Sequence, residues 1–230
     1  MSATARAMLF DLDGTLIDSM PHHQAAWREW HARRQLAVDA EAFFAATAGR
    51  SNAEIFADMF PGLSLAEYAT LIDERETLYL DIAARKLGLI AGADAYAERA
   101  RTAGWRLAVC TASTAPSMAF AYQRFGIDRW VDTTVSPADG LRGKPHPDVF
   151  LEGARRLGAL PADCIVFEDA PLGIEAARRA GMRAVALTTT LPASAFSGFD
   201  NVIAIAADFT DPALMNMIPD LTPSFSKAAP

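Results

Sequence analysis

The sequence contains little cysteine and little histidine, and it has no long apolar segment. Its 230 residues include 2 Cys and 4 His, too few for a disulfide framework, and no His/Cys group has zinc-site spacing. Cys110 and Cys164 lie in apolar runs typical of buried strands, which favours reduced thiols in a cytoplasmic protein. No run approaches the roughly 18 apolar residues of a membrane span, and the N-terminus lacks a signal-peptide pattern. We therefore expect a cytoplasmic protein with no membrane segment.

The chain also has a deficit of positive charge. It contains 28 Asp and Glu against 21 Lys and Arg, so its net charge is −7, which argues against a nucleic-acid or anionic-membrane surface. A single basic pocket for a phosphate is compatible with this charge. Hydrophobic residues make up 51% of the chain, as in an ordinary globular protein. Nothing in the sequence defines an oligomeric state, and a monomer is compatible with it.

Two different patterns divide the chain. From residue 20 to about residue 87 it is helical throughout. The remainder alternates short apolar strands with helices, which predicts right-handed βαβ units and a parallel sheet. The expected strands are Met8–Phe10, Leu107–Cys110, Val131–Val135, Ile165–Phe167, Ala184–Leu187 and, as a further candidate, Val202–Ala206. The expected helices are near 22–35, 39–48, 52–60, 64–87, 93–103, 116–125, 147–157 and 171–180.

We therefore predict an α/β fold, a Rossmann-like, doubly wound parallel sheet that is interrupted after its first strand by an inserted α-helical cap domain. The core domain would comprise residues 1–15 and 89–230, and the cap would comprise residues 16–88. The cap would then lie over the C-terminal edge of the sheet, where doubly wound folds place their sites. The last dozen residues, which are rich in proline, are expected to form a loose tail.

Two carboxylates follow the first expected strand in the run Asp11-Leu12-Asp13-Gly14-Thr15. One carboxylate can bind a metal ion and attack a substrate, while the other can exchange a proton with a leaving oxygen. The alternative explanation is a polar turn after a strand.

A hydroxyl pair and a lysine follow later strands. Thr111 and Ser113 come directly after the second strand, where a hydroxyl can donate to a phosphate oxygen or can cap the next helix. Lys144 is flanked by Gly143 and Pro145 and suits a phosphate or a carboxylate, although a lone lysine is usually solvated.

Two acids, Glu168 and Asp169, follow the fourth strand. Their oxygens are ligands that Mg²⁺ prefers, and the alternative for Asp169 is a helix cap before Pro171. Because parallel strands end at one edge of a sheet, all four motifs should meet there. A nucleophile, an acid, a hydroxyl, a lysine and metal carboxylates are what a phosphoryl transfer requires.

The order of these motifs resembles that of the haloacid dehalogenase superfamily. The pattern is Asp-x-Asp-Gly-Thr from Asp11, then Thr111, then Lys144 in Gly-Lys-Pro-x-Pro-Asp, then Glu168-Asp169, and the helical insertion resembles that superfamily's small α-helical cap. The run 18–23 together with Trp27 resembles the β-phosphoglucomutase and sugar-phosphatase branch. The resemblance covers nearly the whole chain.

The resemblance implies a role for each matching residue. Asp11 would be the nucleophile and a metal ligand, and Asp13 the general acid/base whose main-chain carbonyl also binds Mg²⁺. Thr111 and Lys144 would hold the transferred phosphoryl group, Asp169 would bind the metal, and Glu168 would be a ligand or lie just behind one. The residues expected to contact substrate are Thr15, His23, Trp27, Gly49, Arg50, Asn52, Ala112 and Ser113.

We expect a phosphatase that acts on a small phosphorylated metabolite, such as a sugar phosphate, through an aspartyl-phosphate. An acid at position 13 suits phosphate esters, whose leaving oxygen needs a proton. The alternative is a β-phosphoglucomutase-type mutase, which must also hold a second phosphate. The basic residues that resemble its anchors are replaced by Asn52, Thr114 and Ala115, although Arg50 could serve instead. A third, less favoured class is a phosphate-responsive signalling module, which has no need of a cap.

Overall fold

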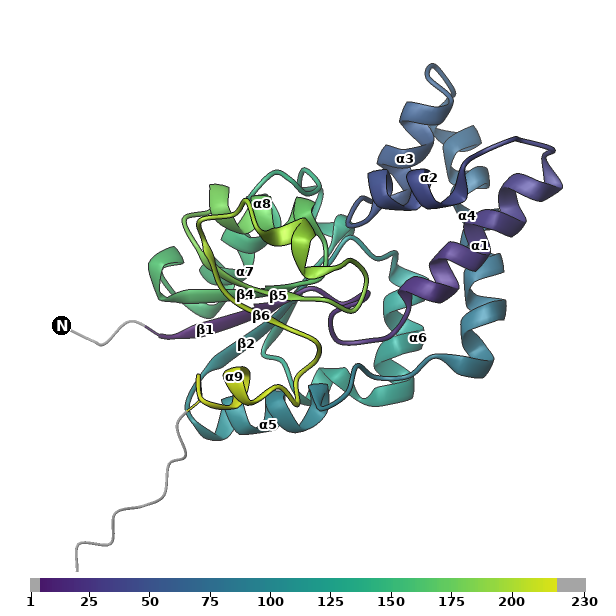
Figure 1. Cartoon of the computed structure of the whole chain (residues 1–230). Helices are drawn as coiled ribbons and strands as arrows, with labels where there is room; N and C mark the ends of the chain where they lie inside the picture. Colours follow the sequence, from purple (N-terminus) through teal and green to yellow (C-terminus); the bar gives the residue numbers. More distant parts are fainter. Residues whose placement is uncertain (1–4, 219–230) are drawn as a thin grey trace, which may run out of the picture.

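A six-stranded, wholly parallel sheet forms the centre of the protein in the computed structural model, which describes residues 5–218 (Figure 1). The order of strands across the sheet is β3-β2-β1-β4-β5-β6, so the first strand of the chain lies near the middle. This order confirms the expected doubly wound, Rossmann-like sheet. The strands are β1 (Ala7–Phe10), β2 (Arg106–Cys110), β3 (Thr133–Val135), β4 (Cys164–Glu168), β5 (Arg183–Leu187) and β6 (Val202–Ala206).

Helices cover both faces of this sheet. Helices α7 and α8 pack on one face, while α5, α6 and α9 pack on the other (Figure 1). These helices are α5 (Ala93–Thr102), α6 (Ala115–Phe125), α7 (Asp148–Leu157), α8 (Pro171–Arg179) and α9 (Pro212–Met215). Short 3-10 turns lie at Ile127–Arg129, Pro137–Asp139, Pro161–Asp163 and Ala193–Phe196.

The two-sided burial explains the sequence of the central strands. In β1, Met8 and Phe10 contact the apolar cluster under α5, while Ala7 and Leu9 contact the cluster under α7 and α8. Because successive side chains point to opposite faces, a strand covered on both faces is apolar at every position. All four residues of β1 are at most 1% exposed.

Four helices form a separate layer beside the C-terminal edge of the sheet (Figure 1). Two of them begin at capping boxes, since the Ser51 and Ser64 hydroxyls accept from the third helical N–H and the glutamate there accepts in return. Trp30 and Phe56 pack at the centre of the layer with their rings 5.1 Å apart. The helices are α1 (Met20–Arg33), α2 (Ala40–Thr47), α3 (Asn52–Met59) and α4 (Leu65–Lys86).

The two connections between this layer and the sheet are paired with each other. The Asp18 N–H donates to the Gly88 carbonyl at 2.9 Å, and the Ile90 N–H donates to the Leu16 carbonyl at 3.0 Å. An isolated antiparallel bridge between Ile17 and residue 89 lies between these two bonds. The chain therefore enters and leaves the helical layer at one place.

Two expectations about the ends of elements need comment. The third strand begins at Thr133 and not at Val131, because the Asp132 carboxylate accepts from the Leu107 N–H at 2.9 Å and occupies the start of the ladder. The expected C-terminal tail, the last dozen residues, is residues 219–230, which lie outside the described residues.

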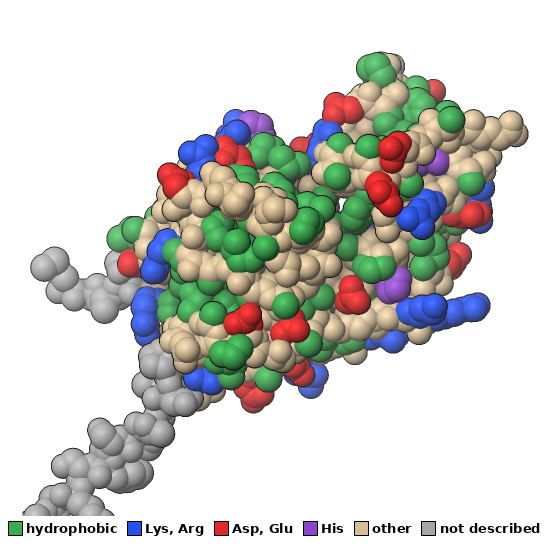
Figure 2. All heavy atoms as spheres, in the orientation of Figure 1, with side chains coloured by type: hydrophobic (Ala, Val, Ile, Leu, Met, Phe, Trp, Pro, Cys, Tyr) green, Lys and Arg blue, Asp and Glu red, His purple; other side chains and the backbone are tan. Residues whose placement is uncertain are grey.

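The distribution of charge on the surface and the hydropathy of the helices complete the description of the fold. On the face in Figure 2, Lys and Arg side chains are scattered among Asp and Glu and do not gather into one basic area. Between residues 5 and 218, no helix is both long enough and apolar enough to cross a membrane.

Candidate active site

The motifs that follow the strands meet at the edge of the sheet beneath the helical layer. Asp11, Asp13, Thr111 and Asp169 line one cavity of about 660 Å³, measured to include its mouth toward solvent. The structure thus brings together side chains that are up to 158 residues apart in the sequence.

Lys144 connects two carboxylates at the floor of the site. Its Nζ donates to Asp11 Oδ1 at 2.5 Å and to Glu168 Oε1 at 2.7 Å, and all three side chains are buried. Burial raises the pKa of Asp11 to about 7, and the Glu168 and Asp13 carboxylates add to the shift while Lys144 opposes it. Lys144 is therefore the cation that holds Asp11 in place, and the reading of a solvated surface lysine is wrong.

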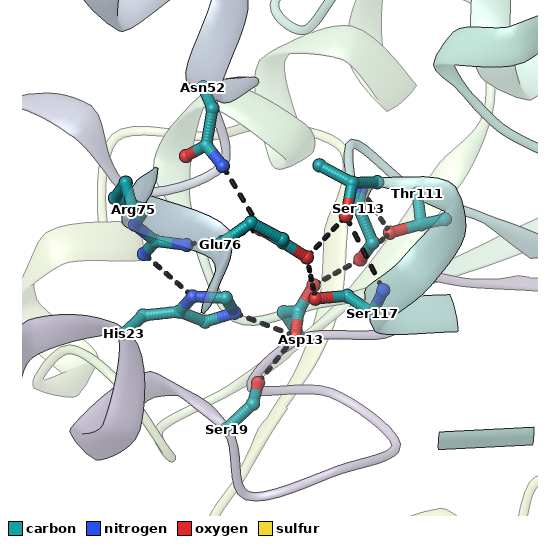
Figure 3. Close-up of polar contacts among 10 residues, drawn as sticks. Asp13, Ser19, His23, Asn52, Arg75, Glu76, Thr111, Ser113 and Ser117 are labelled. Carbon is teal, nitrogen blue, oxygen red and sulfur yellow. Dashed lines mark hydrogen bonds and ion pairs between the residues drawn. The ribbon is translucent and has the colours of Figure 1, made fainter. Parts of the chain in front are cut away.

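Asp13 lies in a different electrostatic environment. Its Oδ1 accepts from the Ser19 hydroxyl at 2.6 Å and contacts His23 Nε2 at 3.0 Å, and its Oδ2 accepts from the Ser113 hydroxyl (Figure 3). Burial would raise the pKa of Asp13, but His23 and the two hydroxyls outweigh it and hold that pKa well below its ordinary value. The pKa of Asp13 is thus lowered while that of its neighbour Asp11 is raised, which separates the two acids chemically.

The tautomer of His23 follows from its partners. Arg75 Nη2 lies 2.7 Å from His23 Nδ1, and since a guanidinium has no acceptor, that ring nitrogen must accept. The proton of the neutral ring is then on Nε2, from which it is donated to Asp13. Burial and the Arg75 charge both lower the pKa of His23, in agreement with a neutral ring. The His23 ring stacks on Tyr79 with centroids 3.9 Å apart.

The acids at this edge fit a magnesium ion. Asp169 is 2% exposed, its Oδ1 accepts from the Thr15 hydroxyl at 3.2 Å, and its buried Oδ2 has no hydrogen-bond partner among the described residues. Burial and the carboxylates of Glu168 and Asp11 raise the pKa of Asp169 well above its ordinary value. Crowded hard oxygens that resist ionisation are what a divalent cation stabilises. Within residues 5–218 no group of three or more Asp, Glu, His or Cys side chains is placed to hold a metal ion by itself. The expected main-chain carbonyl of Asp13 would therefore be needed as a ligand.

Glycine leaves room for Asp169. Gly14 has a φ of +77°, and a Cβ at this position would lie 2.2 Å from Asp169 Oδ2. Both the left-handed conformation and the close approach require glycine here.

Glu168 contacts protein groups with both of its oxygens. Oε1 accepts from Lys144, and Oε2 accepts from the N–H groups of Asp169 and Ala170, both at 2.9 Å. These contacts favour a residue that supports Lys144 over a direct metal ligand, and the ligand role stays a prediction. The close approach of Gly173 makes this arrangement possible, because a Cβ there would lie 1.8 Å from Oε1.

Neither of the capping explanations holds. The residue that caps α6 is Thr114, whose hydroxyl accepts from the Ser117 N–H, so Thr111 and Ser113 are left to face the cavity. Helix α8 has Ala170 at its cap position, with no side-chain cap, so Asp169 does not serve as one.

The residues expected to contact substrate also gather at this cavity. Thr15 is the exception, because its hydroxyl is directed to Asp169. Arg50 forms an ion pair with Asp58 at 2.6 Å, and Asn52 Nδ2 donates to Glu76 Oε2 at 3.3 Å. The predicted residues that line the cavity are His23, Trp27, Gly49, Arg50, Asn52, Ala112 and Ser113.

Sequence reasoning missed a buried ion pair from α4. Arg75 and Glu76 are 2% and 4% exposed, and both line the cavity (Figure 3). Arg75 Nη1 lies 3.7 Å from Glu76 Oε2. A signal was available, since both lie between Ile72 and Tyr79 on the apolar face of the helix. A charge on such a face is expected to be paired or functional.

Comparison with known proteins agrees with this geometry. Residues 5–181 match the model of the haloacid dehalogenase-like hydrolase family, and the chain belongs to this family. It is 33% identical to hexitol phosphatase A of Escherichia coli over 79% of this chain and 82% of that protein, and 27% identical to β-phosphoglucomutase of Bacillus subtilis over 89% and 92%. A haloacid dehalogenase family IA hydrolase from Entamoeba histolytica superposes with a TM-score of 0.81, at 24% identity over 93% of this chain and 98% of that one. Members of the superfamily generally use Mg²⁺.

Proposed function

We propose that the protein is a magnesium-dependent phosphatase that hydrolyses a small phosphorylated metabolite, such as a sugar phosphate, with Asp11 as the nucleophile. The observation that carries this proposal is the contrast between the two acids of one cavity. Asp11 contacts Lys144, while Asp13 contacts a separate set of groups, the His23 ring and the hydroxyls of Ser19 and Ser113. This division suits one acid to attack and the other to proton transfer.

In the first step an Asp11 carboxylate oxygen attacks phosphorus and the bond from phosphorus to the ester oxygen breaks. Asp13 gives its proton to that leaving oxygen. A bound phosphate brings two negative charges beside Asp13, which raises its pKa and favours the protonated form that this step needs. In the second step Asp13 takes a proton from water, the water oxygen attacks phosphorus, and the bond to Asp11 breaks to release phosphate.

Other side chains of the chain support these steps. Lys144 and Thr111 would hold the oxygens of the transferred group, and Glu168 would keep Lys144 in position through its contact at 2.7 Å. Asp11, Asp169 and the Asp13 carbonyl would hold Mg²⁺, which when bound neutralises the charge between the carboxylates and the phosphoryl oxygens. The helical layer, residues 16–88 in our proposal, would act as a cap that excludes bulk water.

The phosphatase is favoured over the mutase by the walls of the cavity. Both kinds of enzyme occur among the relatives, so sequence similarity does not decide between them. At the positions of the expected second-phosphate anchors the cavity has Asn52 and Thr114, both of which contact the Glu76 carboxylate. Arg50, the substitute anchor, is paired with Asp58. These contacts support a site for one phosphate.

The test is a screen of phosphorylated metabolites with Mg²⁺ in which released phosphate is measured. We expect turnover without a bisphosphate activator, and no turnover in Asp11→Asn, since an amide cannot attack phosphorus. Asp13→Asn should lose about 10²–10⁴-fold in kcat. Primer-dependent conversion of β-glucose 1-phosphate to glucose 6-phosphate with little free phosphate would establish the mutase instead.

A long-lived aspartyl-phosphate with no turnover would favour the signalling module. The cytoplasmic location expected from the sequence stays a prediction.

A further inference from the structure

The cavity has a second polar centre away from Asp11. Glu76 enters it from α4, and its Oε1 accepts a hydrogen bond from the Ser117 hydroxyl (Figure 3). The same oxygen accepts from the Thr114 hydroxyl, and both hydroxyls belong to the start of α6. Its Oε2 accepts from Asn52 Nδ2 at 3.3 Å. A buried carboxylate therefore connects the helical layer with the α/β core at the wall of the cavity.

The hydrogen bonds of Glu76 leave capacity on one oxygen only. A carboxylate oxygen accepts about two hydrogen bonds, and Oε1 already receives two. Oε2 receives one from Asn52, and Arg75 Nη1 is beyond hydrogen-bond distance at 3.7 Å. Oε2 can thus accept one more donor, next to an amide that has a further N–H and an oxygen of its own. A donor and an acceptor side by side fit a substrate hydroxyl.

The same centre is unfavourable for an anion. A second phosphate or a carboxylate at this wall would lie beside the Glu76 carboxylate, and close like charges in a buried site are strongly disfavoured. Arg75 offsets this effect only in part, because its Nη1 lies 3.7 Å from Glu76 Oε2, while its Nη2 donates to His23 Nδ1 and its guanidinium lies over the Trp27 ring at 5.0 Å.

We propose that Glu76 and Asn52 form the subsite that binds an uncharged, hydroxyl-bearing end of the substrate and rejects substrates whose far end is anionic. This inference rests on the phosphatase function proposed above and narrows it to monophosphates of polyols and sugars. Apolar side chains on the same cavity, such as Ile55 and Phe44, would contact the carbon chain between the two ends.

The experiment uses pairs of substrates that differ only at the far end. Glycerol 3-phosphate is compared with 3-phosphoglycerate, and sorbitol 6-phosphate with 6-phosphogluconate, so that a terminal hydroxymethyl group is replaced by a carboxylate at two chain lengths. The measured quantity is the ratio of kcat/KM within each pair. For the wild type we expect a preference of at least ~100-fold for the hydroxyl member of one pair.

Glu76→Gln keeps the shape of the side chain and removes its charge. We expect it to reduce the preference at least ~10-fold, because the hydroxyl loses a charged acceptor and the carboxylate loses a repelling neighbour. Asp73→Asn, an exposed acid of the same helix, is the matched control and should leave the ratio unchanged. If Glu76→Gln fails to fold, Asn52→Arg places a positive charge beside Glu76 at a half-buried position. It should offset the repulsion of a substrate carboxylate and raise kcat/KM for the carboxylate members.

The outcomes separate the two proposals. A wild type that releases no phosphate from these four esters or from p-nitrophenyl phosphate would refute the phosphatase function itself. Phosphate release from p-nitrophenyl phosphate with no preference for hydroxyl members, or a preference that Glu76→Gln leaves unchanged, would overturn only the role of Glu76.

Discussion

Replacement of Gly173 by alanine tests how the floor of the active site is built. Gly173 lies in the first turn of α8, where a Cβ would be 1.8 Å from Glu168 Oε1 and 1.9 Å from its Cδ. Two opposing effects are expected. Alanine is favoured over glycine in a helix by about 1 kcal/mol, which would stabilise the protein. The clash must move Glu168, and hydrogen bonds to a charged group contribute about 1.5–3 kcal/mol each.

The second effect should dominate. Glu168 accepts three hydrogen bonds, from Lys144 and from two backbone N–H groups, and it is fully buried, so no solvent replaces a bond that is lost. The loss of two of them, less the helical gain, gives a net destabilisation of roughly 2–5 kcal/mol. For a chain of this length the melting temperature should fall by roughly 4–20 °C. Phosphatase activity should fall too, because Lys144 loses the partner that positions it.

The assay is urea unfolding of Gly173→Ala beside Gly198→Ala, a control at an exposed glycine with no atom within 4 Å of the added methyl group. The double variant Glu168→Ala, Gly173→Ala should show a strongly non-additive change in the free energy of unfolding, since removal of the glutamate also removes the clash. Stability and activity equal to the wild type in Gly173→Ala would refute the claim that this glycine makes room for Glu168.

Three further predictions concern other parts of the molecule. Trp30→Ala should destabilise the protein by about 3–5 kcal/mol in urea unfolding, because the ring is fully buried among aromatic neighbours, and a loss below 1 kcal/mol would contradict this packing. Exhaustive chelation should abolish phosphate release, and added Mg²⁺ should raise the melting temperature of the wild type but not of Asp169→Asn; full activity in chelator would contradict the proposed metal site. Arg75→Met should raise the pKa of His23 in an NMR titration, because removal of a neighbouring cation makes the protonated ring less costly, whereas an unchanged or lower pKa would show that the guanidinium does not act on this ring.

The motifs of the core were predictable because they depend on the position of a residue relative to a strand end. Asp11 and Asp169 each follow an apolar strand, and strands that alternate with helices place such residues at a common edge. The strands themselves were recognisable because burial on both faces makes them apolar throughout, as in β1 and β4.

The contacts made by the helical layer were not predictable in the same way. Glu76 belongs to α4, and its hydroxyl partners Thr114 and Ser117 belong to α6, so their meeting depends on how the two elements pack. In a single sequence a charged pair on a helix is most often explained by solvent exposure. The contact between Glu168 and Lys144 was also not predictable, because the sequence does not show which of the two adjacent acids, Glu168 or Asp169, contacts the lysine.

The central position of β1 has a consequence for synthesis of the chain. Ala7 pairs with Arg106 on one side and with Cys164 on the other, so β1 leaves the ribosome before either neighbouring strand and cannot pair until they follow. Such non-local pairing makes folding slow and exposes apolar segments meanwhile. Helices α2, α3 and α4 have side-chain caps, and aromatic rings such as Trp30 and Phe56 contact each other within the layer, so these helices can form before the sheet does. We therefore expect the nascent chain to acquire helix early and its sheet only once the residues of β4 have been translated.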